Sequence, residues 1–197
     1  MNDFLVWAQL GIEHIADFSG YDHMLFLLSL MISYSFRQWK PLLALLSGFT
    51  IGHSLTLILS VSGVLSISSA WVELLIPATI FITSLYRIQH FQKNTTSSVL
   101  FSLLLTTLFG CIHGLGFSNY LRSLLGSETS LWLPMIAFNL GIELGQLIVV
   151  SVLLLFSLFL YRFVRIHPFH WNFYLASAVS GVAFVMMIER ASFLLNG

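Results

Sequence analysis

Several ionisable side chains stand inside, or at the ends of, stretches that are otherwise almost entirely apolar. They are Asp22, His23, His53, Glu73, His113 and Glu143. Ionisable groups are costly in a lipid bilayer, so their presence in such stretches indicates a functional site. Imidazole and carboxylate groups together suit zinc, nickel, cobalt and iron. If these side chains converge in the fold, they form a site for a divalent transition-metal ion.

The metal ligands that we predict are His23, His53, His113, Glu143 and Asp22, with His14, Glu73, Ser54, Asn139 and Gln146 as further or supporting members of the site. Asp22 has three roles open to it, because a carboxylate at a helix start can cap backbone N–H groups, bind a metal or orient a neighbouring histidine. Glu143 shares one helical face with Asn139 and Gln146, which makes a polar stripe on an apolar helix. A bound cation would offset the burial of this carboxylate, which otherwise favours the protonated form.

Plain structural explanations exist for part of this set. The outer ends of membrane helices are wet and tolerate charge, which accounts for Asp22, Glu73 and His113. A histidine inside a span can hydrogen-bond to another helix, and a protonated glutamate can belong to a packing network. His53 and Glu143 lie too deep in their segments for the first explanation, so they carry most of the argument for a site.

The composition is that of an integral membrane protein. The chain has 197 residues, of which 57% are hydrophobic and 8% charged, whereas soluble domains have about 25% charged residues. The net charge is zero, so nucleic acid is not an expected partner. A single cysteine, Cys111, excludes an internal disulfide and a zinc site built from cysteines.

Apolar runs predict an all-α membrane bundle in one domain, residues 1–197, with an interfacial segment at 1–20 and six spanning helices within 21–197. A span needs about 20 apolar residues, and the candidates are 22–37, 41–62, 70–88, 98–118, 131–160 and 171–190. Residues 4–17 alternate apolar and charged side chains, which is typical of an amphipathic helix lying on or dipping into the membrane surface.

The basic residues indicate how the bundle is oriented. Alternate connections carry the pairs Arg37 and Lys40, Arg87 and Lys93, and Arg162 and Arg165. Connections rich in Lys and Arg face the cytoplasm, so both termini are expected outside. We expect a multi-pass protein of the bacterial inner (plasma) membrane. In this orientation every predicted ligand lies at or outside the midplane of the bilayer.

At these residues the chain resembles the HupE/UreJ family of membrane proteins. The matching stretches are G-x-D-H at 20–23, F-T-x-x-H-S-x-T-L at 49–57, V-E at 72–73, F-G-x-x-H-G-x-G-F at 109–117 and F-N-x-G-x-E-x-G-Q at 138–146, within roughly residues 11–160. The resemblance implies nickel or cobalt handling, as a permease or as an accessory protein of hydrogenase or urease. His14 lies further from Gly20 than the corresponding histidine of the family pattern, so it stays outside our main ligand set.

Three functions remain open on the residues alone. The first is a permease that captures Ni²⁺ or a similar ion from outside and passes it inward, with the lipid bilayer and the ion as partners. Since six spans are few for a transporter, a homo-oligomer is part of this hypothesis. The second is an intramembrane zinc hydrolase, with Glu143 or Asp22 as general base and Ser54 or Asn139 near the oxyanion. The third is a non-catalytic bundle, which leaves the Glu143 stripe unexplained.

Overall fold

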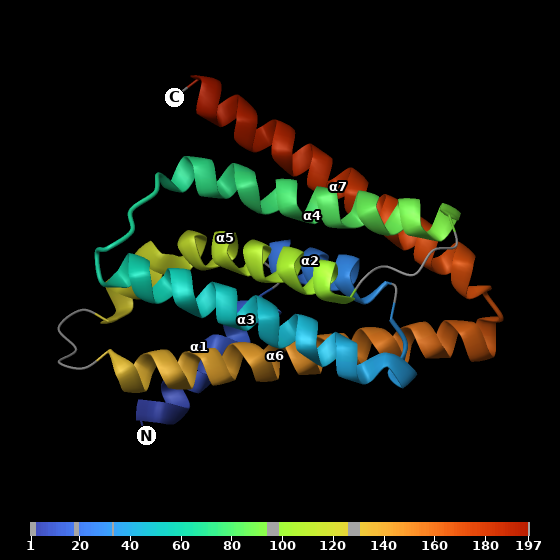
Figure 1. Ribbon diagram of the computed structural model, residues 1–197, viewed down its shortest axis with the longest axis horizontal. Coiled ribbons are helices and arrows are strands. Elements are labelled where there is room, and N and C mark those ends of the chain that lie inside the picture. Colours follow the sequence, from blue (N-terminus) through green and yellow to red (C-terminus); the bar gives the residue numbers. More distant parts are fainter. Residues whose placement is uncertain (1–2, 18–19, 33, 94–98, 126–130, 197) are drawn as a thin grey trace.

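The computed structural model describes residues 3–17, 20–32, 34–93, 99–125 and 131–196, which contain helices and no strand. The elements are α1 (Asp3–Ala16), α2 (Asp22–Met31), the 3₁₀ turn η1 (Phe36–Gln38), α3 (Trp39–Val61), α4 (Ser69–Lys93), α5 (Val99–Leu125), α6 (Trp132–Phe159), the π-helical turn η2 (Leu160–Val164) and α7 (Pro168–Asn196). The predicted all-α membrane bundle is confirmed. Figure 1 shows α3 to α7 running back and forth along the long axis of the molecule.

The number of spans is smaller than predicted. Among the described residues, five helices, α3 to α7, are long and apolar enough to cross a membrane. The predicted span 22–37 is instead the helix α2, whose 10 residues rise about 15 Å, half the thickness of a bilayer core. The sequence beyond it starts a new helix: Ser35 and Gln38 form a reciprocal capping box at η1, and this pair fixes the turn into α3.

The N-terminal helix forms as predicted, but its apolar face is covered by protein. Gly11 of α1 lies so close to α6 that an added Cβ would overlap the carbonyl oxygen of Phe138, and a Cβ on Gly141 would overlap that of Ala8. Small residues facing each other let two helices approach to backbone contact. This contact holds α1 along α6 and so places the last turn of α1 inside the bundle.

Three helix pairs account for most of the packing: α3 with α5, α1 with α6, and α4 with α7. The connection between α3 and α4, at residues 62–68, lies at the same end of the molecule as both chain termini (Figure 1). We call this the outer end, because the distribution of Lys and Arg predicts that it faces outward. The other end, where α3 and α7 begin, is the inner end.

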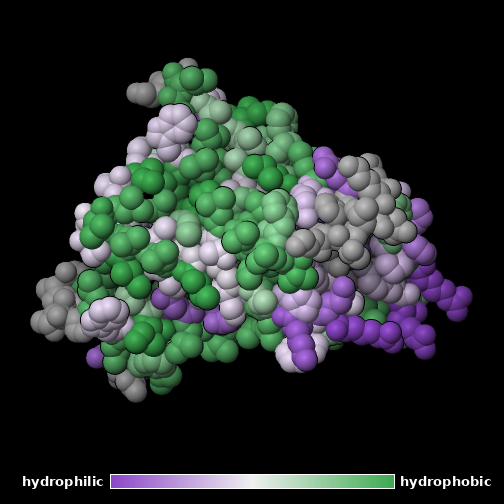
Figure 2. Space-filling model, in the orientation of Figure 1, coloured by the Kyte–Doolittle hydropathy of each residue, from purple (hydrophilic) through white to green (hydrophobic). Residues whose placement is uncertain are grey.

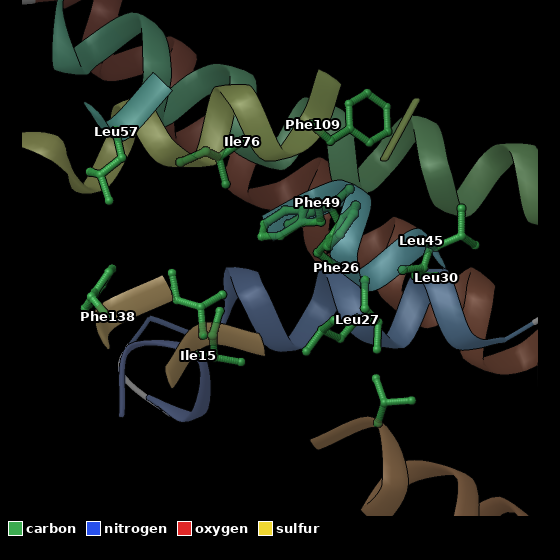
Figure 3. Close-up of a cluster of buried hydrophobic side chains, with 14 of the residues drawn as sticks. Ile15, Phe26, Leu27, Leu30, Leu45, Phe49, Leu57, Ile76, Phe109 and Phe138 are labelled. Carbon is green, nitrogen blue, oxygen red and sulfur yellow. The ribbon is translucent and has the colours of Figure 1, made fainter. Parts of the chain in front are cut away.

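The surface and the interior are both apolar, as expected for a membrane protein. Figure 2 shows a face that is largely hydrophobic, with its strongly hydrophilic side chains gathered mainly at the inner end. Inside, rings and branched chains from several helices fill the space between α2, α3 and α5 (Figure 3). Phe26 of α2 and Phe49 of α3 meet there, with ring centroids 4.9 Å apart. This core lies on the inner-end side of the histidines described next.

Candidate metal centre

The close crossing of α3 and α5 positions two of the histidines. A Cβ on Gly52 would overlap the carbonyl oxygen of Thr107, and one on Gly114 would overlap the carbonyl oxygen of His53. The two backbones therefore touch where each helix carries a histidine, His53 on α3 and His113 on α5. Both side chains are almost fully buried, with 0% and 1% of their surface exposed. The glycines explain why these helices can meet at this level.

The junction of α1 and α2 supplies the other two histidines. His14 lies in the last turn of α1 and His23 in the first turn of α2. The break between the two short helices brings their rings together, with centroids 4.4 Å apart. An uninterrupted helix would separate residues 14 and 23 by about 13 Å along its axis. The interruption of the N-terminal segment is therefore what joins them.

The four rings form one group, which we call the histidine cluster: His14, His23, His53 and His113. The centroid of His53 is 5.8 Å from that of His14 and 6.4 Å from that of His23. The centroids of His23 and His113 are 5.3 Å apart. Two imidazoles that bind one ion through bonds of about 2.1 Å have centroids roughly 4.5 to 6.5 Å apart. The three distances given in this paragraph fall within that range.

Most ring nitrogens of the cluster are buried and have no hydrogen-bond partner. These atoms are Nε2 of His14, Nε2 of His23, Nε2 of His113 and both ring nitrogens of His53. Buried polar groups are normally paired, because an unpaired one costs about 1 to 3 kcal/mol. Five such atoms on four adjacent rings are a consistent sign of a ligand that accepts nitrogen lone pairs.

Two of the rings are already oriented for this role. Nδ1 of His113 donates a hydrogen bond to the carbonyl oxygen of Phe109, 2.8 Å away. Nδ1 of His23 lies 3.1 Å from Oδ1 of Asp22. A hydrogen bond at Nδ1 leaves Nε2 as the nitrogen that carries the free lone pair, and metal-binding histidines usually have such a partner. Asp22 thus stands as the group that orients His23.

The cluster is not a finished coordination shell. Among the residues that the structure describes, no three histidine, cysteine, aspartate or glutamate side chains have ready metal-ligating geometry. The donor chemistry and the ring spacings given above suit a transition-metal ion, but the described side chains do not form a metal site as they stand. Rotation of imidazole about χ2 is a soft torsion, and it is the adjustment that binding would require.

Aromatic side chains cover part of the cluster. The ring of Phe117 lies 3.9 Å from that of His14, and Phe49 and Phe26 lie 5.2 and 5.5 Å from that of His113 (all between centroids). Exclusion of water strengthens electrostatic attraction at such a site. The surroundings of the cluster thus favour the binding of a cation by neutral imidazoles.

Two groups on the short helices have shifted acidities. Burial holds the pKa of His14 well below the ordinary histidine value, and positive charge on His23 or His53 would lower it further. His14 is therefore neutral near pH 7, with a lone pair available for a metal. Burial raises the pKa of Asp22, but the attraction of His23 and its hydrogen bonds outweigh that effect, and the pKa falls to about 2. Asp22 is thus a carboxylate at any physiological pH.

Glu143 is not brought to the histidines. Its Oε1 accepts a hydrogen bond from Oγ of Ser47, 2.5 Å away. Ser47 precedes His53 by six residues on α3, which is about 9 Å closer to the inner end. Between these levels, Oγ1 of Thr50 donates to Oε1 of Gln146 at 3.1 Å. Glu143 and Gln146 of the α6 stripe therefore contact α3 below the cluster, and binding of the same ion by Glu143 remains a prediction without support from this geometry.

The remaining predicted residues lie around the cluster or apart from it. Oγ of Ser54 donates to the carbonyl oxygen of Thr50 at 2.6 Å, while Oδ1 of Asn139 is buried without a partner. Glu73 is at the outer end, where its Oε2 accepts a hydrogen bond from Nη1 of Arg190 on α7 at 2.9 Å. Glu73 therefore links α4 to α7.

The sequence pattern places His14 outside the main predicted ligand set and does not single out Ser47. The histidine lies in a segment that reads as a surface helix, and only its packing on α6 carries it to the cluster. Ser47 stands three residues before Thr50 and six before His53. Because residues three apart lie on the same side of a helix, this spacing could have identified Ser47 as a neighbour of the site.

Comparison with known proteins identifies the family of the chain. No curated protein and no solved structure matches the chain. The model of the family described as HupE / UreJ protein matches residues 1–193. Since this match covers nearly the whole sequence, the chain belongs to the HupE/UreJ family.

Proposed function

We propose that this protein binds a transition-metal ion of the nickel or cobalt type in the histidine cluster and carries it across the membrane. The observation that carries the proposal is the set of five buried, unpartnered ring nitrogens on four adjacent histidines. Imidazole nitrogen suits nickel, zinc, copper and iron. Because the family is associated with nickel and cobalt, these are the metals to test first. In this proposal the ion is the substrate that is transported.

Polar side chains continue from the cluster toward the inner end. Below His53 come the pair Thr50–Gln146 and then the pair Ser47–Glu143, all between α3 and α6. A cation that leaves the histidines would meet hydroxyl, amide and carboxylate oxygens between α3 and α6. These oxygen donors support passage inward through the α3–α6 contact.

The hydrolase hypothesis receives no comparable support. It needs a base close to a metal-bound water. Within the described part of the chain, Glu143 is hydrogen-bonded to Ser47 below the cluster, and Asp22 faces His23. Neither carboxylate is placed as a free base on an open side of the histidines.

The test combines binding and transport in the purified, reconstituted protein. Co²⁺ binding is followed by visible absorption, and Ni²⁺ uptake is followed in proteoliposomes. His53→Ala removes two of the unpartnered nitrogens, so it should weaken Co²⁺ binding by at least about 100-fold, more than loss of a supporting group does, and abolish saturable Ni²⁺ uptake. His167→Ala is the matched control, because this histidine is exposed at the inner end; it should leave both measurements unchanged.

The results separate the competing functions. Stoichiometric binding without flux in the wild-type protein would argue against transport and favour a resident metal. Unchanged Co²⁺ binding in His53→Ala, with wild-type folding by circular dichroism, would contradict the assignment of the cluster as the metal centre.

A further inference from the structure

A cavity of about 550 Å³ lies beside the histidine cluster, between α1 and the outer part of α5. Its walls are formed by Leu10, Glu13, His14, Ala16, Asp17, Phe117 and Tyr120. Glu13, Asp17 and Tyr120 are exposed, whereas Nε2 of His14 is buried. The cavity thus leads from the molecular surface to a member of the cluster.

The two faces of α1 explain why acidic groups gather there. Gly11 and Ile15 belong to the face that is buried, with Gly11 in backbone contact with α6. Glu13 and Asp17, four residues apart, share the opposite face, and His14, three residues before Asp17, lies between the two faces. Because the buried face of α1 is fixed on α6, the side chains of the opposite face line the cavity. His14 is the residue that reaches both the cavity and the other histidines.

The charge of the lining suits a cation. It holds two carboxylates and no Lys or Arg among the described lining residues. Nε2 of Gln9 donates to Oε1 of Glu13 at 2.7 Å, which steadies that carboxylate at the rim. A concave surface of one charge sign raises the local concentration of the opposite ion and its association rate by about 10- to 1000-fold. At the buried side of the cavity, the Phe117 ring lies against that of His14.

We infer that this cavity is the outer vestibule for the divalent cation: Glu13 and Asp17 collect the ion, and His14 passes it to His23 and His53. The inference rests on the proposed metal binding. It assigns capture to residues outside the cluster, and it makes the gap between α1 and α5 the route of entry. His14 is both the end of the vestibule and part of the centre.

The experiment measures how fast Co²⁺ reaches the cluster in the full-length protein in nanodiscs, by stopped-flow absorption. It is run at about 20 mM salt, where charges are weakly screened, and at about 500 mM salt, where they are strongly screened. The variant combines Glu13→Gln with Asp17→Asn. At low salt its association rate should fall about 10-fold or more, and the difference should shrink at high salt. Its dissociation rate and final stoichiometry should stay close to those of the wild type.

A matched control removes the same charge elsewhere. Asp3→Asn with Glu189→Gln neutralises two exposed carboxylates outside the cavity, and its association rate should remain within about twofold of the wild-type rate, because these carboxylates do not line the concave surface that concentrates the ion. Equal association rates for the vestibule variant and the wild type, with the same salt dependence, would overturn the vestibule while leaving the metal centre intact. A wild-type protein that binds no Co²⁺ would overturn both the vestibule and the proposed function.

Discussion

The histidine cluster owes its chemistry to what each ring nitrogen does and does not contact. Nδ1 of His113 is occupied by a backbone carbonyl and Nδ1 of His23 by a carboxylate, while Nε2 of each is left without a partner. These local bonds select the tautomer before any ligand arrives. Asp22 is the most informative residue to change, because it contacts His23 through its side chain and also accepts a hydrogen bond from the His23 backbone N–H at 2.9 Å.

Asp22→Asn should weaken Co²⁺ binding about 10- to 100-fold, the usual cost of losing the partner of a ligating histidine. The amide keeps the size of the side chain but loses the charge that favours the Nδ1–H tautomer of His23. The Co²⁺ absorption spectrum should keep its shape, because the donor atoms are the same. Titration of the purified protein, with Asp3→Asn as the exposed control, measures both quantities.

A changed spectrum would have a different meaning. It would show that Asp22 is itself bound to the metal, as our ligand set from the sequence has it. Affinity equal to that of the wild type would remove Asp22 from the site and leave it as a cap of α2.

At the scale of the helices, glycines decide where the side chains go. Gly52 of α3 contacts the backbone of α5, and an added methyl group there would overlap the carbonyl oxygen of Thr107. Gly181 of α7 has no atom within 4 Å of the position that a Cβ would take. The same substitution therefore has opposite expected effects at these two positions.

Gly52→Ala should destabilise the folded protein by about 1 to 3 kcal/mol, as overpacking does, and should weaken Co²⁺ binding by moving His53 away from His113. Gly181→Ala should leave binding unchanged and stabilise the helix by up to about 1 kcal/mol, because alanine is the better helix former. Thermal unfolding in detergent, followed by circular dichroism, together with Co²⁺ titration tests the pair. Equal stability of the two variants would contradict the close α3–α5 contact.

The helices themselves could be predicted from the sequence, but their partners could not. Apolar runs located all five long helices, and the interrupted stretch at the N-terminus predicted a separate short helix. The run at 22–37 misled, because hydropathy alone does not reveal that Ser35 and Gln38 begin a new helix. A reciprocal cap of this kind satisfies two backbone N–H groups at a helix start, so it favours a helix that begins after Ser35.

The candidate site was predictable to the same degree. Histidines in apolar segments pointed to His23, His53 and His113, which do come together. The place of Glu143 depended on how α6 crosses α3, and spacing along one helix carries no information about the level of its neighbour. His14 joined the cluster through the contact between Gly11 and α6, a tertiary effect that no local pattern encodes.

At the scale of the whole molecule, the two ends differ in how their basic residues are held. At the outer end, Arg122 donates to the carbonyl oxygen of Ser60 and Arg190 to Glu73. At the inner end, Arg37, Arg162 and Arg165 are exposed at the molecular surface. Exposed basic residues near helix ends keep the segment that bears them in the cytoplasm. The outer end has only Arg122 and Arg190 among the Lys and Arg residues of the sequence, so the count predicts that the inner end faces the cytoplasm.

This asymmetry predicts which side of the membrane faces the acidic cavity. In a Cys111→Ser background, Ser66→Cys lies between α3 and α4 at the outer end, and His170→Cys lies near the start of α7 at the inner end. Both positions are exposed. A membrane-impermeant maleimide should label Ser66→Cys in intact cells and should label His170→Cys only after permeabilisation. The reverse pattern would place Glu13 and Asp17 on the cytoplasmic side, and the protein would then collect its cation from inside and serve export.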